Sequence, residues 1–171
     1  MSHGRHPQRN IVLTGFHAAG KSAVGHELSR RMRRPFVDVE AELRRRRSRM
    51  RVLLPLSAMD DEDAQRSLIS DLSYRQEMIL DLQVSAAVHV DCYRELRDFS
   101  FIVFIDPPVD VLLCRMRGDR RYREMLDTYG EKGLAYKLDA LRPQLEHCDF
   151  QIVGEYTAQR TAALIIHSFF T

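Results

Sequence analysis

Short apolar runs alternate along the chain with longer segments of helical periodicity. The clearest apolar runs cover residues 11–14, 35–39, 99–106 and 150–153, and each has the length of a buried strand. The apolar stretch "LQVSAAVHV", residues 82–90, predicts a further buried strand.

Helical periodicity is found between these runs, over residues 21–32, 61–82 and 109–117 and again from Thr157. Strands separated by helices predict an α/β fold, in which helices cover both faces of a parallel sheet. We therefore expect a three-layer sandwich around a five-stranded parallel sheet. The length of 171 residues suits one domain over residues 1–171.

Composition narrows the classes of partner. The formal net charge of +2 is too small to indicate nucleic-acid binding, although 23 of the 26 basic residues are arginine. No apolar run is long enough to span a bilayer, and the polar N-terminus lacks the apolar segment of a secretory signal. Three cysteines without metal-site spacing indicate reduced thiols. We expect a cytoplasmic monomer or weak dimer without nucleic-acid or membrane partners.

One motif carries specific chemistry. Residues 15–22, "GFHAAGKS", fit G-x-x-x-x-G-K-[ST], directly after a predicted strand and at the start of a predicted helix. Such a loop aims backbone N–H groups at phosphate oxygens, while Lys21 contacts the β- and γ-phosphates and Ser22 offers a hydroxyl to Mg²⁺. A glycine turn with a buried lysine stem is the alternative, and it does not explain the spacing. The predicted nucleotide-binding positions of this loop are Gly15, Ala18, Ala19, Gly20, Lys21, Ser22 and Ala23.

The longer stretch "NIVLTGFHAAGKSAVGHELSRRMRRPFVDVEAELRRR", residues 10–46, resembles the N-terminal quarter of shikimate kinases. These are small single-domain members of the nucleoside monophosphate kinase-like group. The resemblance implies a phosphotransferase that uses ATP and Mg²⁺. It would transfer the γ-phosphate to a hydroxyl of a small anionic acceptor, shikimate or a related hydroxy acid.

The acidic pair in "DVE" matches the D-x-D motif of that family. The resemblance places Asp38 beside Mg²⁺, which it would hold together with Ser22, and beside the attacking hydroxyl. It gives Glu40 the role of binding the acceptor's hydroxyls. In an extended segment the two side chains would point to the same side. The alternative is a carboxylate pair that only favours a helix N-terminus.

The resemblance also implies arginines that bind the acceptor's carboxylate. Arg66 matches the first of them, with Arg75 as second choice, in an acceptor-binding region of about residues 39–82. Arg142 matches the second, just ahead of the last strand. Arg66 or Arg75 could instead belong to a solvated helix face.

The polar segment "RGDRRYREML" falls where the family has a mobile lid, about residues 117–127. Arg123 matches the lid arginine that stabilises the moving phosphoryl group, so Lys21, Asp38 and Arg123 are the predicted catalytic residues. Arg117 falls near the arginine that stacks on the adenine. The alternative is a solvated basic loop.

The chain departs from the family at the end of the third strand, where shikimate kinases have three glycines. Residues 84–88 read "VSAAV", so Ser85 and Ala86 would stand at the acceptor. An alternative register ends a generic strand in a metal-facing carboxylate at Asp91, although His89 and Asp91 could be ordinary polar residues. The departure leaves two alternative functions open: a nucleoside or nucleotide kinase, and a degenerate nucleotide-binding regulatory module.

Overall fold

The computed structural model describes residues 8–53, 61–83, 90–142 and 148–170. Five strands form one parallel sheet with the order β2-β3-β1-β4-β5. The predicted α/β sandwich is therefore confirmed. The strands are β1 (Asn10–Gly15), β2 (Phe36–Asp38), β3 (Ile79–Asp81), β4 (Ser100–Asp106) and β5 (Phe150–Val153).

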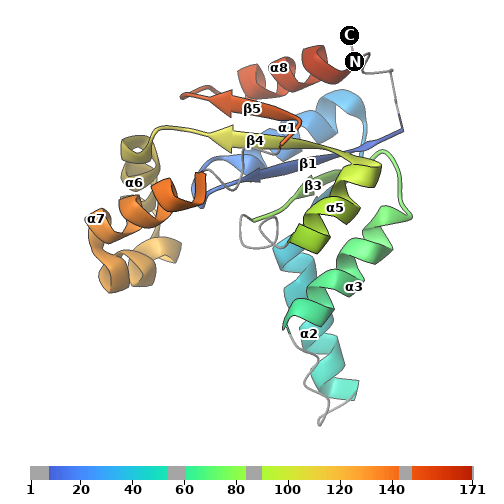
Figure 1. Ribbon diagram of the computed structural model, residues 1–171, viewed down its shortest axis with the longest axis horizontal. Helices are drawn as coiled ribbons and strands as arrows, with labels where there is room; N and C mark the ends of the chain where they lie inside the picture. Colours follow the sequence, from blue (N-terminus) through green and yellow to red (C-terminus); the bar gives the residue numbers. More distant parts are fainter. Residues whose placement is uncertain (1–7, 54–60, 84–89, 143–147, 171) are drawn as a thin grey trace.

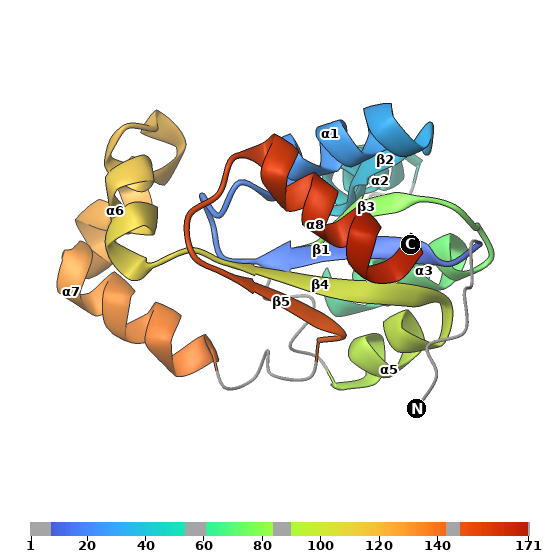
Figure 2. The same ribbon diagram turned by 90° about the horizontal axis from the view of Figure 1, so that it is seen from above.

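Helices cover both faces of this sheet and its carboxyl-terminal end. Helices α1 and α8 lie together on one face, and α3 and α5 lie together on the other (Figures 1 and 2). Helices α6 and α7 lie beyond the end toward which the arrows of β1, β4 and β5 point (Figure 1). The described helices are α1 (Lys21–Met32), α2 (Val39–Leu53), α3 (Asp61–Ser73), α5 (Val90–Phe99), α6 (Val109–Arg117), the 3-10 helix η1 (Arg120–Tyr122), α7 (Arg123–Leu141) and α8 (Ala158–Phe170).

The central strands explain why the apolar runs are continuous rather than alternating. Every residue of β1 and β4 is buried, because a parallel sheet covered on both faces offers no solvated side. Leu28 of α1 and Ile165 of α8 are fully buried on one face, and Leu68 of α3 is fully buried on the other. The core thus fixes the carboxyl ends of β1 and β4, where the loops begin.

The third strand lies upstream of its predicted place. Helix α3 ends at Ser73 and β3 covers Ile79–Asp81, so the expected helix over 61–82 was too long. The expected strand over 82–90 is wrong at its end, because Val90 begins α5. With only three residues, β3 is too short to show the alternation of apolar and polar residues that identifies a strand. Its apolar residues extend the helical pattern that precedes them.

The second strand is also shorter than predicted. It ends at Asp38, and Val39 already belongs to α2. Asp38 and Glu40 therefore do not share an extended segment: one ends a strand and the other lies in the first turn of a helix. Among the described residues, no helix combines the length and the apolar character needed to cross a membrane.

Candidate active site

The phosphate-binding loop connects β1 to α1 and needs glycine at two positions. Gly15 has φ +146°, and a Cβ there would lie 2.5 Å from the carbonyl oxygen of Ile105. Gly20, just before α1, has φ +93°. Both backbone conformations disfavour other residues. The Lys21 ammonium donates hydrogen bonds to the carbonyl oxygens of Gly15 (3.1 Å) and Phe16 (2.8 Å), so the loop curls around its own lysine.

Lys21 is the buried cation of the site. Only 7% of it is exposed, and burial lowers the pKa of its ammonium. Three carboxylates oppose that shift and favour the charged form: Asp81, then Glu40, then Asp38. The positive end of α1 points at the same place, because Lys21 is its first residue.

Asp81 is a site residue that the sequence reasoning missed. It ends β3 and stands in register with Asp38, which ends the neighbouring β2. The Ser22 hydroxyl donates a 2.6 Å hydrogen bond to its carboxylate. Burial raises the pKa of Asp81, although Lys21 and the bond from Ser22 favour its charge. The apolar residues 78–80 directly before an aspartate were the available signal. The carboxylate sought at Asp91 does not end a strand, since that residue lies in α5.

Asp38 and Glu40 come together at the same cavity in spite of the changed secondary structure. Asp38 accepts a 2.9 Å hydrogen bond from the Ala41 backbone N–H and so caps α2. Glu40 accepts a hydrogen bond from the Gln83 amide and forms a 3.3 Å ion pair with Arg44. The helix-capping alternative and the site assignment are thus compatible for Asp38.

These residues line a cavity of about 600 Å³ between the phosphate-binding loop and η1. His17 of the loop makes an edge contact with the Tyr122 ring of η1, at 5.7 Å between centroids. Burial and the nearby Lys21 lower the pKa of His17. The charged and amide side chains that line the cavity are Lys21, Asp38, Glu40, Arg44, Asp81, Gln83, Arg115, Asp119 and Arg121.

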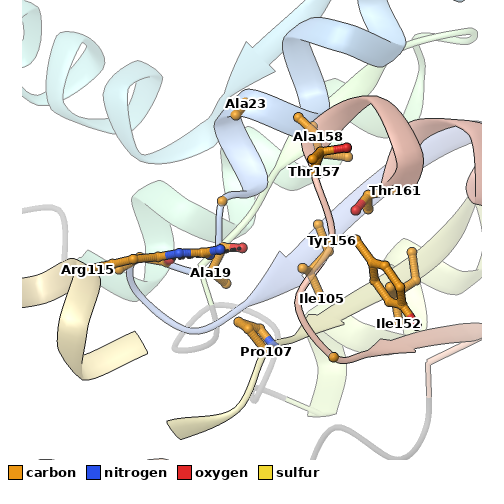
Figure 3. A pocket seen from close by; sticks show the side chains of 14 residues that line it. Ala19, Ala23, Ile105, Pro107, Arg115, Ile152, Tyr156, Thr157, Ala158 and Thr161 are labelled. Carbon is orange, nitrogen blue, oxygen red and sulfur yellow. Dashed lines mark hydrogen bonds between the residues drawn. The ribbon is translucent and has the colours of Figure 1, made fainter. Parts of the chain in front are cut away.

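A second cavity, of about 300 Å³, is also lined in part by the loop (Figure 3). It is mostly apolar, with Ile105, Pro107 and Tyr156 among its lining residues. Arg115 reaches from α6 to the loop beside Ala19 (Figure 3). Its guanidinium donates to the carbonyl oxygens of Ala18 (3.3 Å) and Ala19 (3.4 Å) and to the Glu155 carboxylate (3.2 Å). Arg115 therefore lines both cavities and joins the phosphate-binding loop to the segment after β5.

The two arginines predicted for the lid, Arg117 and Arg123, do not line the main cavity. Arg117 is exposed and bonded to Glu131 of α7. It lines, together with Arg123, a separate hollow of about 340 Å³. In the described part of the chain, Arg115 and Arg121 face the main cavity instead.

The arginines predicted to bind the acceptor's carboxylate do not line the main cavity either. Arg142 donates to the Asp106 carboxylate (3.0 Å), the Asp139 carboxylate (3.0 Å) and the Pro107 carbonyl (3.3 Å).

Arg66 is exposed on α3. Arg75 lines a further hollow that also contains Ser22 and Asp38. Ser85 and Ala86, like His89, lie outside the described residues.

The side-chain oxygens beside the loop are of the kind that Mg²⁺ binds. Within the described ranges, no three His, Cys, Asp or Glu side chains form a group that would hold a metal by themselves. Mg²⁺ does not require such a group, because it keeps waters and binds one or two carboxylates together with substrate phosphates. Ser22, Asp38 and Asp81 supply a hydroxyl and two carboxylates at adjacent places.

A phosphate-binding loop after the central strand, a parallel sheet of this order and carboxylates at the ends of neighbouring strands define a P-loop kinase. The model of the shikimate kinase family matches residues 17–168. The chain belongs to the shikimate kinase family. It is a kinase, a phosphotransferase with an alcohol group as acceptor.

Relatives and solved structures agree with this assignment. A shikimate kinase of Salinibacter ruber is 31% identical over 140 residues, which are 80% of this chain and 67% of that protein. One of Burkholderia thailandensis is 30% identical over 141 residues, 80% of this chain and 73% of that protein.

The fold matches that of two solved shikimate kinases. The enzyme from Bacteroides thetaiotaomicron superposes with a TM-score of 0.78 at 16% identity, over 94% of this chain and 98% of that one. The enzyme from Acinetobacter baumannii, in complex with shikimate, gives 0.75 at 21% identity, over 95% and 96%.

Proposed function

We propose that this kinase transfers the γ-phosphoryl group of ATP to a hydroxyl of shikimate or a related small hydroxy acid, with Mg²⁺. One observation carries the proposal: four side chains line the same cavity in a member of the shikimate kinase family, namely Lys21, Ser22, Asp38 and Asp81. The whole chain acts as one domain, with an acceptor-binding region of about residues 39–82 and a lid of about 117–127.

The nucleotide lies across the phosphate-binding loop. The backbone N–H groups from Gly15 to Ala23 and the first turn of α1 receive the phosphate oxygens. The base occupies the 300 Å³ cavity, whose apolar lining suits a flat ring. Arg115 takes the place beside the base that the sequence suggested for Arg117, because Arg115 is the arginine that lines this cavity.

The transfer itself is electrostatic. Lys21 releases its contacts with the Gly15 and Phe16 carbonyls and stabilises the charge that develops on the phosphoryl oxygens. Ser22, Asp38 and Asp81 would hold Mg²⁺, which would neutralise part of the phosphate charge. Asp38 orients the acceptor hydroxyl and accepts its proton. Arg121 lines the cavity and supplies positive charge from the lid to the phosphoryl group. Arg123, which lines the neighbouring hollow, supplies its charge if the lid moves inward.

The acceptor lies against α2 and the end of β3. Glu40 and the Gln83 amide bind its hydroxyls, and Arg44 offers a guanidinium to an anionic group.

The family resemblance assigns four further residues to the acceptor: Arg66, Ser85, Ala86 and Arg142. Of these, Arg142 has the weakest case, because its guanidinium is already bonded to Asp106 and Asp139.

The experiment is an ATP-consumption assay with Mg²⁺ on shikimate, other hydroxy acids, nucleosides and nucleoside monophosphates. We expect turnover with shikimate or another hydroxy acid. Lys21→Ala should lose at least about a hundredfold in kcat without unfolding the protein, because it removes charge stabilisation from the transition state. Lys132→Ala, at an exposed lysine of α7, is the matched control and should retain activity.

Two results would contradict the proposal. Turnover restricted to nucleosides or their monophosphates would move the acceptor to another class. Full activity in Lys21→Ala would remove the phosphate-binding loop from the reaction. Nucleotide binding without turnover on any acceptor would instead support the regulatory module.

A further inference from the structure

Two side chains that line the main cavity take no part in the proposed transfer: His17 of the phosphate-binding loop and Tyr122 of η1. Their rings make an edge contact, at 5.7 Å between centroids, which joins the loop to the lid. We propose that this ring contact places the Arg121 guanidinium at the cavity, so that His17 and Tyr122 are positioning residues for the phosphoryl transfer. The inference rests on the proposed function, because it assumes that Arg121 supplies charge to the moving group.

The loop holds His17 from both sides. Phe16, which precedes it, is buried and packs edge-on against the Phe104 ring, at 5.7 Å between centroids. Ala18, which follows it, has φ +58°, a conformation that a residue other than glycine keeps only where its surroundings impose it. The Ala18 carbonyl oxygen accepts a 3.3 Å hydrogen bond from Arg115. The His17 ring is therefore a fixed point against which another ring can rest.

The lid needs such a fixed point, because it lies between two glycines. Gly118 follows α6, and α7 is interrupted at Gly130, where φ is +62° and ψ is 168°. The first turns of α7 are therefore not continuous with the rest of that helix. Helix η1 itself packs mainly against α6 and α7, its neighbours in the sequence. Tyr122 packs against the core and also contacts the loop, so it links this segment to the centre of the domain.

Tyr122 also limits the positions that Arg121 can take. The Arg121 guanidinium lies 5.7 Å from the centroid of the Tyr122 ring, within the range of a cation–π contact. Its Nε donates a 2.9 Å hydrogen bond to the Asp119 carboxylate, which also accepts from the Arg121 backbone N–H at 3.0 Å. Because 79% of the Arg121 side chain is exposed, these contacts restrict a side chain that otherwise has many rotamers. Without the ring, the guanidinium would depend on Asp119 alone.

The test compares kcat among variants, with ATP, Mg²⁺ and acceptor saturating and with correction for the folded fraction. Tyr122→Leu removes the ring from both contacts, whereas Tyr122→Phe keeps it. His17→Leu removes the same contact from the loop side, and it serves if Tyr122→Leu does not fold. His17→Phe keeps a ring without the imidazole nitrogens. Tyr129→Leu is the matched control, because the Lys137 ammonium lies 3.6 Å from the centroid of the Tyr129 ring and Tyr129 does not line the cavity.

We expect Tyr122→Leu and His17→Leu each to lower kcat by about three- to tenfold, the factor that ring contacts of this kind supply. Tyr122→Phe and His17→Phe should recover most of that loss, and Tyr129→Leu should match the wild type. In Tyr122→Leu the KM values for ATP and acceptor should stay within about twofold, because Arg121 acts on the group in transfer.

A double-variant cycle separates positioning from a structural role. In an Arg121→Gln background, Tyr122→Leu should lower kcat no further, because both changes act through the same guanidinium. Additive losses would overturn the inference, since the ring would then act independently of Arg121.

Two other results would also overturn the inference and leave the proposed function intact. One is unchanged kcat in Tyr122→Leu. The other is a loss in His17→Phe as large as that in His17→Leu, because the imidazole would then act directly rather than through the ring contact. If the wild-type protein phosphorylates no acceptor, both the proposed function and this inference fall.

Discussion

Gly25 of α1 is the point where the first helix rests on the second strand. A Cβ at this position would lie 2.2 Å from Cε2 and 2.7 Å from Cδ2 of the Phe36 ring. The closest ordinary contact is 3.4 Å, so helix and ring would have to separate by about 1.2 Å. His26 packs on the same ring at 4.4 Å between centroids, on the side chain that would have to move. Gly25→Ala therefore drives α1 away from β2.

Two terms set the size of the effect on stability. Alanine improves helix propensity by about 1 kcal/mol relative to glycine. Overpacking a tight contact costs about 1–3 kcal/mol, and the depth of this overlap places it at the upper end. We expect Gly25→Ala to lower the free energy of unfolding by about 1–2 kcal/mol, which lowers Tm by about 4 °C in a chain of this length.

The same displacement should reach the active site. Helix α1 begins at Lys21, and β2 ends at Asp38, so separating them moves Ser22 relative to Asp38. A misplacement of about 1 Å in catalytic groups costs about a hundredfold in rate. We expect kcat to fall more than the fraction of folded protein does.

The assay is urea unfolding of Gly25→Ala, Phe36→Leu and the double variant. Leucine at position 36 removes the ring edge, so the two changes should cost less together than the sum of their separate costs, by about 1 kcal/mol. Gly133→Ala is the matched control, because a Cβ there lies 3.7 Å from Tyr129 and fits; it should stabilise the protein. Gly25→Ala at or above wild-type stability, or no relief from Phe36→Leu, would refute this reasoning.

Three further outcomes follow from the same structure. Arg142→Ala should lower the free energy of unfolding by about 1–3 kcal/mol, because Asp106 loses a charged hydrogen-bond donor, while the acceptor KM stays within about twofold. A large rise in acceptor KM without loss of stability would instead support the place of Arg142 in the acceptor site. Thr14→Val should stabilise the protein by about 1 kcal/mol in thermal unfolding, because the buried Thr14 hydroxyl has no hydrogen-bond partner among the described residues. Burial raises the pKa of Asp81 in the folded protein. The contribution of Asp81 to the free energy of unfolding is therefore fully present below the pKa of the unfolded state, and it is lost as the pH rises through the pKa of the folded state. Asp81→Asn should therefore raise Tm at neutral pH, with a gain that shrinks as the pH falls toward about 4; a gain independent of pH would contradict this.

The sequence predicted the phosphate-binding loop well because each of its parts is local. Gly15 ends β1, Lys21 and Ser22 begin α1, and α1 begins and ends where predicted. The third strand was misplaced because three residues carry no periodicity, and its terminal Asp81 was lost with it. Only pairing with β1 and β2 identifies that segment as a strand.

The arginines show a second limit of sequence reasoning. Successive helical residues are rotated by about 100°, so Arg115 and Arg117 at the end of α6 point in very different directions. Spacing to a family motif locates such a residue only to within a turn. In this segment Arg115, Arg117 and Arg120 all fall inside that tolerance. The hydrogen bonds from Arg115 to the loop carbonyls of Ala18 and Ala19, which no sequence pattern indicates, are what favour Arg115 in the proposed nucleotide site.

The sheet is unequal in length on its two sides, since β2 and β3 have three residues each whereas β1 and β4 have six and seven. The half that carries α2 and α3 is therefore held by fewer ladder bonds than the half that carries the loop. The free energy of local opening is lowest where a segment is held by few contacts and few backbone hydrogen bonds. Amide protons of β2 and β3 should exchange with deuterium before those of β1 and β4, and this part of the domain can rearrange while the rest stays intact.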